Sequence, residues 1–153
     1  MVTPDISKYL TQQVMTASPA KLVSMLYDKV VISLKEAIAA IENGQIETRW
    51  RANARATEIL SHMWATLDVA KGGEIATNLD QLFSYMLSRL PEVDLRNDPA
   101  PAREVIELIE PLRDSWRELA KRETGGGRAD AASPQAKTSD DMPKAVPSTS
   151  FSA

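Results

Sequence analysis

Apolar residues recur at three- and four-residue spacing along four segments of the chain, which is the period of one face of an α-helix. The first segment begins at Ser18-Pro19, where serine is a good N-cap and proline suits the first helical position. It is predicted to stop at Asn43-Gly44, because glycine commonly follows the last turn of a helix. Its broad apolar stripe predicts a central helix. The stripe comprises Leu22, Met25, Leu26, Val30, Leu34, Ala37, Ile38 and Ile41.

The second segment is predicted to run from about Ile46 to Ala70 and to stop at Gly72-Gly73. Its first half is polar and basic, so we expect that half to be the more exposed one. The basic residues of this half are Arg49, Arg51 and Arg55. The apolar stripe of the whole segment comprises Ile46, Trp50, Leu60, Met63, Trp64 and Leu67.

Two further helical segments follow, and prolines interrupt both. The third begins at Glu74 and keeps the helical period until Pro91, which is predicted to kink or end it because proline lacks an N–H donor and clashes with the preceding turn. Asp98 is the predicted N-cap of the fourth segment. This last helix is expected to bend at Pro111 and to end near Arg122.

Four amphipathic segments joined by short connections indicate an all-α fold, an antiparallel four-helix bundle. Residues 18–122 would form the bundle, and residues 1–17 would form a short N-terminal capping segment that packs against it and could also come off it. Beyond them the chain is rich in Ser, Thr, Ala and Asp and poor in large apolar side chains. Residues 123–153 are therefore predicted to be a disordered tail.

Composition and charge narrow the class of protein. Apolar residues make up 43% of the 153 residues, enough for a sizeable core, and the net charge of −3 argues against non-specific nucleic-acid binding. The absence of cysteine excludes disulfides, thiolate nucleophiles and cysteine-dependent metal sites. No apolar run approaches the roughly 20 residues that span a bilayer, and no signal-like region is visible at the N-terminus. We therefore expect a cytosolic protein without membrane insertion.

No catalytic, cofactor-binding or metal-binding constellation stands out in the sequence. Di-metal carboxylate bundles use Glu-x-x-His pairs on two helices, whereas here the single histidine, His62, lies four residues after Glu58 and has no second pair. The Gly72-Gly73 pair lacks the Lys-Ser/Thr of a phosphate-binding loop. We therefore expect a protein that is not an enzyme and that holds no cofactor and no metal.

The tryptophans and methionines allow two uses that periodicity cannot separate. Core packing is the simpler one, and adaptable methionine-rich and aromatic surface is also typical of a groove that binds a helix. Trp50 lies in an arginine-rich stretch, so we expect it to be partly exposed. The candidates for a groove, each of which could equally belong to the core, are Leu60, Trp64, Leu67, Phe83 and Met86.

Three blocks of sequence, in order, carry a resemblance to a known family. The first is Tyr9-Leu10-Thr11-Gln12-Gln13-Val14-Met15-Thr16-Ala17-Ser18-Pro19, followed by Met25-Leu26-Tyr27-Asp28. The second is Leu67-Asp68 with Gly72-Gly73-Glu74-Ile75-Ala76, Asn78-Leu79 and Tyr85-Met86, and the third is Glu104-Val105-Ile106 with Leu112-Arg113-Asp114-Ser115-Trp116. With this spacing they resemble the flagellar secretion chaperone family FliS.

The resemblance implies a function as well as a fold. FliS-like proteins are cytosolic chaperones that bind the disordered C-terminal segment of flagellin, prevent its premature polymerisation and deliver it to the flagellar type III export apparatus. There they dock on the cytoplasmic domain of the export gate protein FlhA, and no cofactor takes part. This chain departs from the family pattern at Ala20, where an acidic residue is usual, and at Lys29, where glycine is common. It also has Pro91 inside a helix that is usually unbroken.

The resemblance also implies a role for the N-terminal segment. In the family this segment covers part of the groove when no cargo is present, and the role would map here onto Ile6, Tyr9 and Leu10. We expect these residues to be a placeholder that flagellin displaces, and the alternative is a permanent brace of the bundle. The competing function for the whole chain is a helical adaptor that associates with itself and serves another client.

Overall fold

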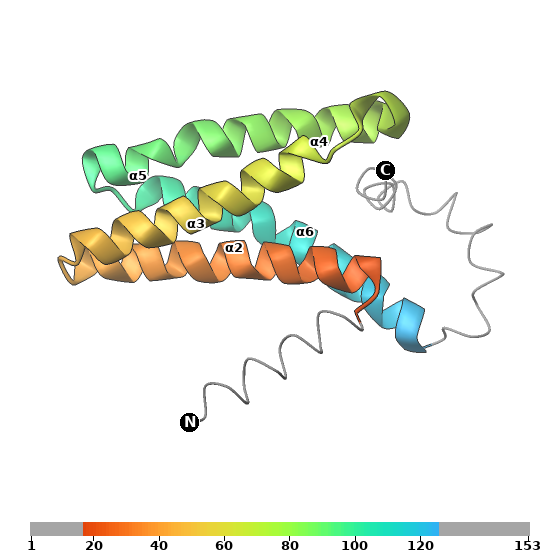
Figure 1. The fold of residues 1–153 in the computed structure, drawn as a ribbon, viewed down its shortest axis with the longest axis horizontal. Coiled ribbons are helices and arrows are strands. Elements are labelled where there is room, and N and C mark those ends of the chain that lie inside the picture. Colours follow the sequence, from red (N-terminus) through yellow and green to blue (C-terminus); the bar gives the residue numbers. More distant parts are fainter. Residues whose placement is uncertain (1–16, 126–153) are drawn as a thin grey trace.

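The computed structural model describes residues 17–125, which form a bundle of four long helices in which consecutive helices run in opposite directions (Figure 1). The four are α2 (Pro19–Glu42), α3 (Ile46–Ala65), α4 (Val69–Arg89) and α6 (Ala100–Gly125), with the short α5 (Pro91–Arg96) between α4 and α6. Residues 17–125 contain no strand. The predicted all-α, antiparallel four-helix bundle is confirmed.

Several predictions lie outside the described residues. They concern the N-terminal capping segment, with Ile6, Tyr9 and Leu10, and the tail from residue 126 onward. Within residues 17–125, no helix combines the length and the apolar character needed to cross a bilayer. The same range contains no group of three or more His, Asp or Glu side chains that could hold a metal ion.

The boundaries of α2 are those that local sequence signals predict. The Ser18 hydroxyl oxygen accepts a hydrogen bond from the backbone N–H of Lys21 at 3.1 Å, and Pro19 occupies the first turn, where an N–H would have no partner. At the other end Asn43 caps the helix and Gly44 adopts a φ of +67°, which glycine tolerates best.

The predicted boundary between the second and third helices is wrong. α3 ends at Ala65 rather than Ala70. Thr66 caps this end, since its backbone N–H donates to the His62 carbonyl and its hydroxyl donates to the Met63 carbonyl. Asp68 then caps α4 by accepting from the backbone N–H of Lys71 at 3.1 Å. The glycine pair therefore lies inside α4, where Gly73 breaks the helix with φ +63° and ψ −144°.

Proline and asparagine control the path from α4 to α6. The sequence predicts the interruption at Pro91 but not the short α5 that follows it. α4 ends at Arg89, and Pro91 opens α5. Asn97 ends α5 in the left-handed conformation, with φ +52°. Asp98 then accepts a hydrogen bond from the backbone N–H of Ala100 at 2.9 Å, so its side chain caps the first residue of α6. It does so from two residues before the helix, because α6 begins at Ala100 and Pro99 lies outside it.

The four helices do not pack equally closely. α2 lies closest to α3 and α6, whereas α4 stands further from both of its neighbours. The size of the buried side chains explains the difference, since alanine and serine let two backbones approach while long side chains hold them apart. Small side chains buried on α2, α3 and α6 are Ala20, Ser24, Ser33, Ala37, Ala40, Ala52, Ala56, Ala102 and Ala120, whereas α4 and its C-cap bury Ala76 together with the larger Leu79, Phe83, Met86 and Leu90.

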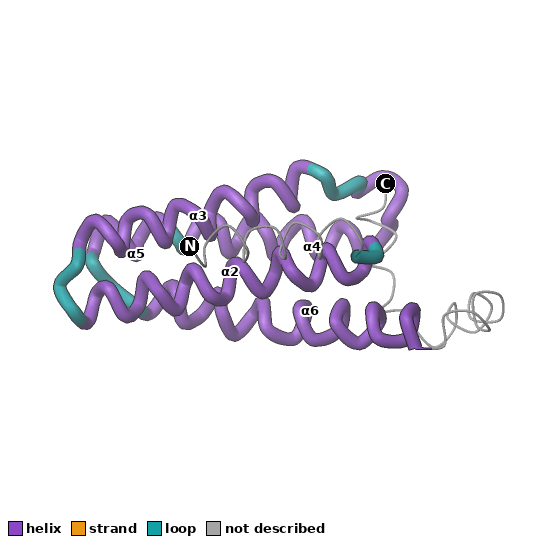
Figure 2. The backbone as a smooth tube through the Cα atoms, turned by 60° about the horizontal axis from the view of Figure 1, so that its bottom comes forward, coloured by secondary structure: helices purple, strands orange, loops and turns teal. Residues whose placement is uncertain are grey.

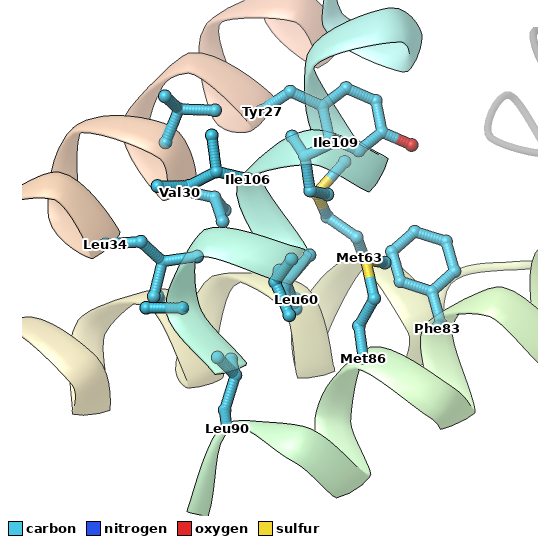
Figure 3. Packing of buried hydrophobic residues seen from close by; sticks show 14 of the residues in the cluster. Tyr27, Val30, Leu34, Leu60, Met63, Phe83, Met86, Leu90, Ile106 and Ile109 are labelled. Carbon is cyan, nitrogen blue, oxygen red and sulfur yellow. The ribbon is translucent and has the colours of Figure 1, made fainter. Parts of the chain in front are cut away.

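The large side chains of α4 meet the other three helices in one core. Figure 3 shows Phe83 and Met86 of α4 pointing toward Met63 of α3, and Tyr27 of α2 lying beside Ile109 of α6. All five are fully or almost fully buried. Burial also raises the pKa of the Tyr27 hydroxyl, which therefore stays protonated at physiological pH. Figure 2 shows α3 at the upper edge and α6 at the lower edge of the bundle, with α2 and α4 between them.

Candidate functional site

The candidate site is a surface rather than a catalytic centre. His62 and Glu58, the one pair with spacing close to that of a metal site, are both exposed on α3 and belong to no group of metal ligands in the part of the chain that the structure describes. What the structure does bring together is exposed apolar surface along α3, flanked by polar contacts that tie α4 to its neighbours.

Three large apolar side chains lie along one strip of α3. Ile46 and Trp64 are 18 residues apart, about five helical turns, so they lie on the same side of the helix, and Trp50 lies one turn after Ile46. Their exposed fractions are 64% for Ile46, 57% for Trp50 and 37% for Trp64. The expected partial exposure of Trp50 is confirmed. We call these three residues the α3 strip.

Trp64 joins the α3 strip to α4. Its indole Nε1 donates a hydrogen bond of 2.7 Å to Asp80 Oδ1 on α4, while more than a third of the side chain stays exposed. A tryptophan held in this way presents a rigid apolar face to solvent, because its only polar atom already has a partner. Such a side chain suits the anchoring of an apolar segment on the surface of the bundle.

The structure separates the candidates for the groove into two groups. Trp64 is exposed, and Leu67 is half-buried in the connection between α3 and α4, where it packs against the core. Leu60, Phe83 and Met86 are fully buried, which is the alternative that the sequence left open for each of them. A partner that binds the bundle as it stands can therefore touch Trp64 and the edge of Leu67, but not the other three.

A polar cluster ties the opposite flank of α4 to α6. The hydroxyl of Tyr85 and the guanidinium Nε of Arg89 both donate to the carboxylate of Glu104, and the Arg89 bond is 2.7 Å long. Arg89 also donates to Glu92 at 3.2 Å. The hydrogen bond from Tyr85, followed by that from Arg89, lowers the pKa of Glu104, and the bond to Glu104 in turn raises the pKa of Tyr85.

Sequence reasoning placed Arg49 on the exposed part of its helix, and this is wrong. Only 8% of Arg49 is exposed. Its Nε donates to Asp94 Oδ1 at 2.9 Å and its Nη1 donates to Asn97 Oδ1 at 2.6 Å. Asn53 supports the same cluster by donating to the Leu90 carbonyl at 2.9 Å and to Asp94 Oδ2 at 3.0 Å. Asn97 is the sequence feature that could have pointed to this cluster. Asparagine often ends a helix in the left-handed conformation, so its polar side chain could be expected near a helix end.

Comparison with known proteins decides the family. The family model described as flagellar protein FliS matches residues 3–123, most of the chain. The chain belongs to the FliS family. A flagellar secretion chaperone FliS of Salmonella typhimurium is 37% identical over 110 residues, which cover 71% of this chain and 82% of that protein. The FliS proteins of Vibrio cholerae, 32% identical over 70% of this chain and 79% of that protein, and of Campylobacter jejuni, 35% identical over 76% and 91%, are also similar.

Membership of the FliS family confirms the resemblance that the three sequence blocks carry. It places the chain among non-enzymatic chaperones of flagellar secretion, in agreement with the expectation that it is not an enzyme. The match to the FliS model extends over all of the helices from α2 to α5 and nearly all of α6. It therefore includes the α3 strip, the hydrogen bond from Trp64 to Asp80 and the polar cluster around Glu104. Pro91, the departure from the unbroken helix typical of FliS, is the residue that separates α4 from α5.

Proposed function

We propose that this chain is a cytosolic export chaperone that binds the C-terminal segment of flagellin, prevents its premature polymerisation and delivers it to the flagellar type III export apparatus. Membership of the FliS family is the observation that carries the proposal. On the same basis the loaded chaperone docks on the cytoplasmic domain of FlhA. The docking step needs no cofactor, since surface complementarity between two folded proteins is sufficient for it.

The exposed apolar surface supports this proposal. A segment that becomes helical in the filament carries an apolar face, and that face needs cover while the segment is in water. Trp50 and Trp64 offer large, rigid apolar area on the same side of α3. Because a disordered segment loses conformational entropy on binding, the contact must be long and mainly apolar to offset that cost.

The proposed contacts of the client are Trp64 and Leu67 at the surface, with Leu60, Phe83 and Met86 behind them. The N-terminal residues Ile6, Tyr9 and Leu10 are proposed to occupy part of the client site until flagellin displaces them. If Tyr9→Ala leaves both the affinity for flagellin and the protease sensitivity of the N-terminus unchanged, the placeholder role is wrong and the brace remains.

Co-elution on a sizing column tests the proposed function. The full chain is mixed with full-length flagellin and, separately, with flagellin that lacks its C-terminal segment. We expect a complex with the full-length protein only. Trp64→Ala should weaken that complex by about tenfold or more, as is typical for an aromatic anchor. The matched control Ile32→Ala removes an exposed apolar side chain from α2 and should leave the complex unchanged.

Two outcomes would contradict the proposal in different ways. If neither flagellin co-elutes, the client is another protein. If, in addition, the chain alone elutes as a stable oligomer, the self-associating adaptor becomes the better interpretation. If the truncated flagellin binds as well as the full-length protein, the chaperone recognises a segment other than the C-terminal one.

A further inference from the structure

Three of the proposed client contacts, Leu60, Phe83 and Met86, are fully buried beneath or on α4. A client reaches them only if a helix of the bundle moves, and α4 is the long helix that packs least closely against its neighbours. Two features of α4 show where such a movement would take place. Its regular helix is interrupted at Gly73 and at Pro91, and exposed polar contacts join it to α3 and α6.

Regular helix is interrupted inside α4 and again just after it. At Gly73 the backbone adopts φ +63° and ψ −144°, and no atom of residues 17–125 lies within 4 Å of where a Cβ would be, so the joint is open on that side. After Arg89 the backbone stays helical at Leu90, but Pro91 has no N–H, so the hydrogen bond that would continue the helix through it is missing. Residues 74–89 are therefore a rod of regular helix between two joints.

The flanks of α4 are held by exposed polar contacts. On the α3 side the contact is the hydrogen bond from Trp64 to Asp80, and on the α6 side it is the cluster of Tyr85, Arg89 and Glu104. By contrast, α2 lies close to both α3 and α6, and all three helices bury alanine or serine side chains. The bundle thus consists of α2 with α3 and α6 packed closely against it, and of one further long helix, α4, that stands off on long side chains.

We propose that residues 74–89 form a hinged flap that swings about Gly73 and Pro91, and that an apolar client segment binds beneath it against Met63, Phe83 and Met86. The identity of the client rests on the proposed function, whereas the movement of the flap does not. Methionine side chains suit such a site, since their flexible thioethers repack around different apolar partners. A client covers the apolar surface that opening exposes, and so it stabilises the open state.

The flap should open in the absence of any client, and hydrogen exchange followed by mass spectrometry measures this. Amides of residues 74–89 should exchange together and faster than those of the buried turns of α2 and α6, because an element that opens by itself does so at a lower free energy than global unfolding. Asp80→Ala and Glu104→Ala each remove one flank contact. Each should raise the exchange rate across residues 74–89 by about two- to tenfold.

The matched control is Glu36→Ala. It removes the exposed ion pair with Arg55, at 3.1 Å, which joins α2 to α3 and does not touch α4. Exchange of residues 74–89 should be unchanged in this variant. The flap is excluded if residues 74–89 exchange only as slowly as α2 and α6, or if the flank variants accelerate exchange no more than Glu36→Ala does.

A binding measurement then separates the flap from the identity of the client. If opening precedes binding, Glu104→Ala, which leaves Trp64 and its hydrogen bond to Asp80 in place, should bind a peptide of the flagellin C-terminal segment more tightly, by the same factor as the increase in exchange. Faster exchange with unchanged or weaker binding in this variant would contradict entry beneath the flap. If the peptide binds neither the wild type nor the variants while the exchange results hold, the flap stands and the flagellin assignment fails.

Discussion

Arg49 and Asp94, 45 residues apart in the chain, form an ion pair of 2.9 Å that ties the first turns of α3 to α5. The Arg49 side chain is 10% exposed and that of Asp94 is 25% exposed. Asn97 accepts a second hydrogen bond from the same guanidinium. The pair therefore fixes the short helix that follows Pro91, and with it one end of α4.

Asp94→Ala should destabilise the fold by about 2–3 kcal/mol. The change leaves the nearly buried charge of Arg49 without its carboxylate partner. Because Asp94 is partly exposed, the loss of folding stability should be smaller than is usual for a fully buried ion pair that loses one partner. Arg49→Lys should also destabilise, since an ammonium cannot reproduce the two directed hydrogen bonds to Asp94 and Asn97. Urea unfolding at constant m value measures both effects.

The control for the Asp94 variant is Glu47→Ala. Glu47 pairs with Arg51 on the same helix at 3.7 Å, and both side chains are largely exposed, so its loss should change stability by about 0.5 kcal/mol or less. Equal losses for Asp94→Ala and Glu47→Ala would show that the buried cluster does not hold α5.

Gly73→Ala should destabilise the protein by about 1–3 kcal/mol, because side chains other than hydrogen rarely adopt the backbone conformation at this joint. The cost is conformational, since an added Cβ would meet no atom of the described part of the chain within 4 Å. Lys71→Ala, an exposed change two residues earlier in α4, should stay within about 0.5 kcal/mol. Thermal or urea unfolding distinguishes the two, and a neutral Gly73→Ala would mean that the joint is regular helix in solution.

Ser33→Ala should stabilise the protein by about 1 kcal/mol. Ser33 is fully buried on α2, and its hydroxyl has no hydrogen-bond partner within residues 17–125, so removing the oxygen relieves a desolvation cost. Ser24 is the natural control, because it is buried on the same helix but donates to the Lys21 carbonyl at 2.8 Å. Ser24→Ala should therefore gain less or lose stability. The melting temperature should rise by about 4–8 °C for Ser33→Ala, and an equal rise in both variants would contradict the assignment.

Local signals explain why much of the fold could be predicted from the sequence. Ser18, Asn43-Gly44 and Asp98 act on neighbouring backbone groups, so residues within a few positions determine these helix ends. The Gly72-Gly73 prediction failed because a competing local signal was stronger. Asp68 supplies a side-chain cap upstream of the glycines, and the helix restarts there.

The candidate site could be predicted less well, because it depends on contacts between distant segments. Periodicity puts Leu60 and Trp64 within one turn of each other, yet Leu60 is fully buried and Trp64 is exposed. What separates them is the position of α4, which no local pattern encodes. The burial of Arg49 has the same origin, since its partner lies on a helix 45 residues away.

Acid should weaken the contact between α4 and α6 before it weakens the core. Hydrogen bonds from Tyr85 and Arg89 lower the pKa of Glu104 below its ordinary value of 4.5. Since the folded-state pKa is the lower one, Glu104 contributes stability above about pH 4.5, and this contribution is lost as the pH falls through its folded-state pKa. The wild type should therefore lose its stability advantage over Glu104→Gln as the pH drops below 4.5, as measured by urea midpoints at successive pH values.

Two further variants test the cause of this pH dependence. Tyr85→Phe removes the hydrogen bond that contributes most to lowering the pKa of Glu104, so it should shift the loss of stability to higher pH. Glu58→Gln changes an exposed carboxylate on α3 and should leave the dependence of stability on pH unchanged. A constant difference between wild type and Glu104→Gln across this pH range would show that the carboxylate does not hold α4 in solution.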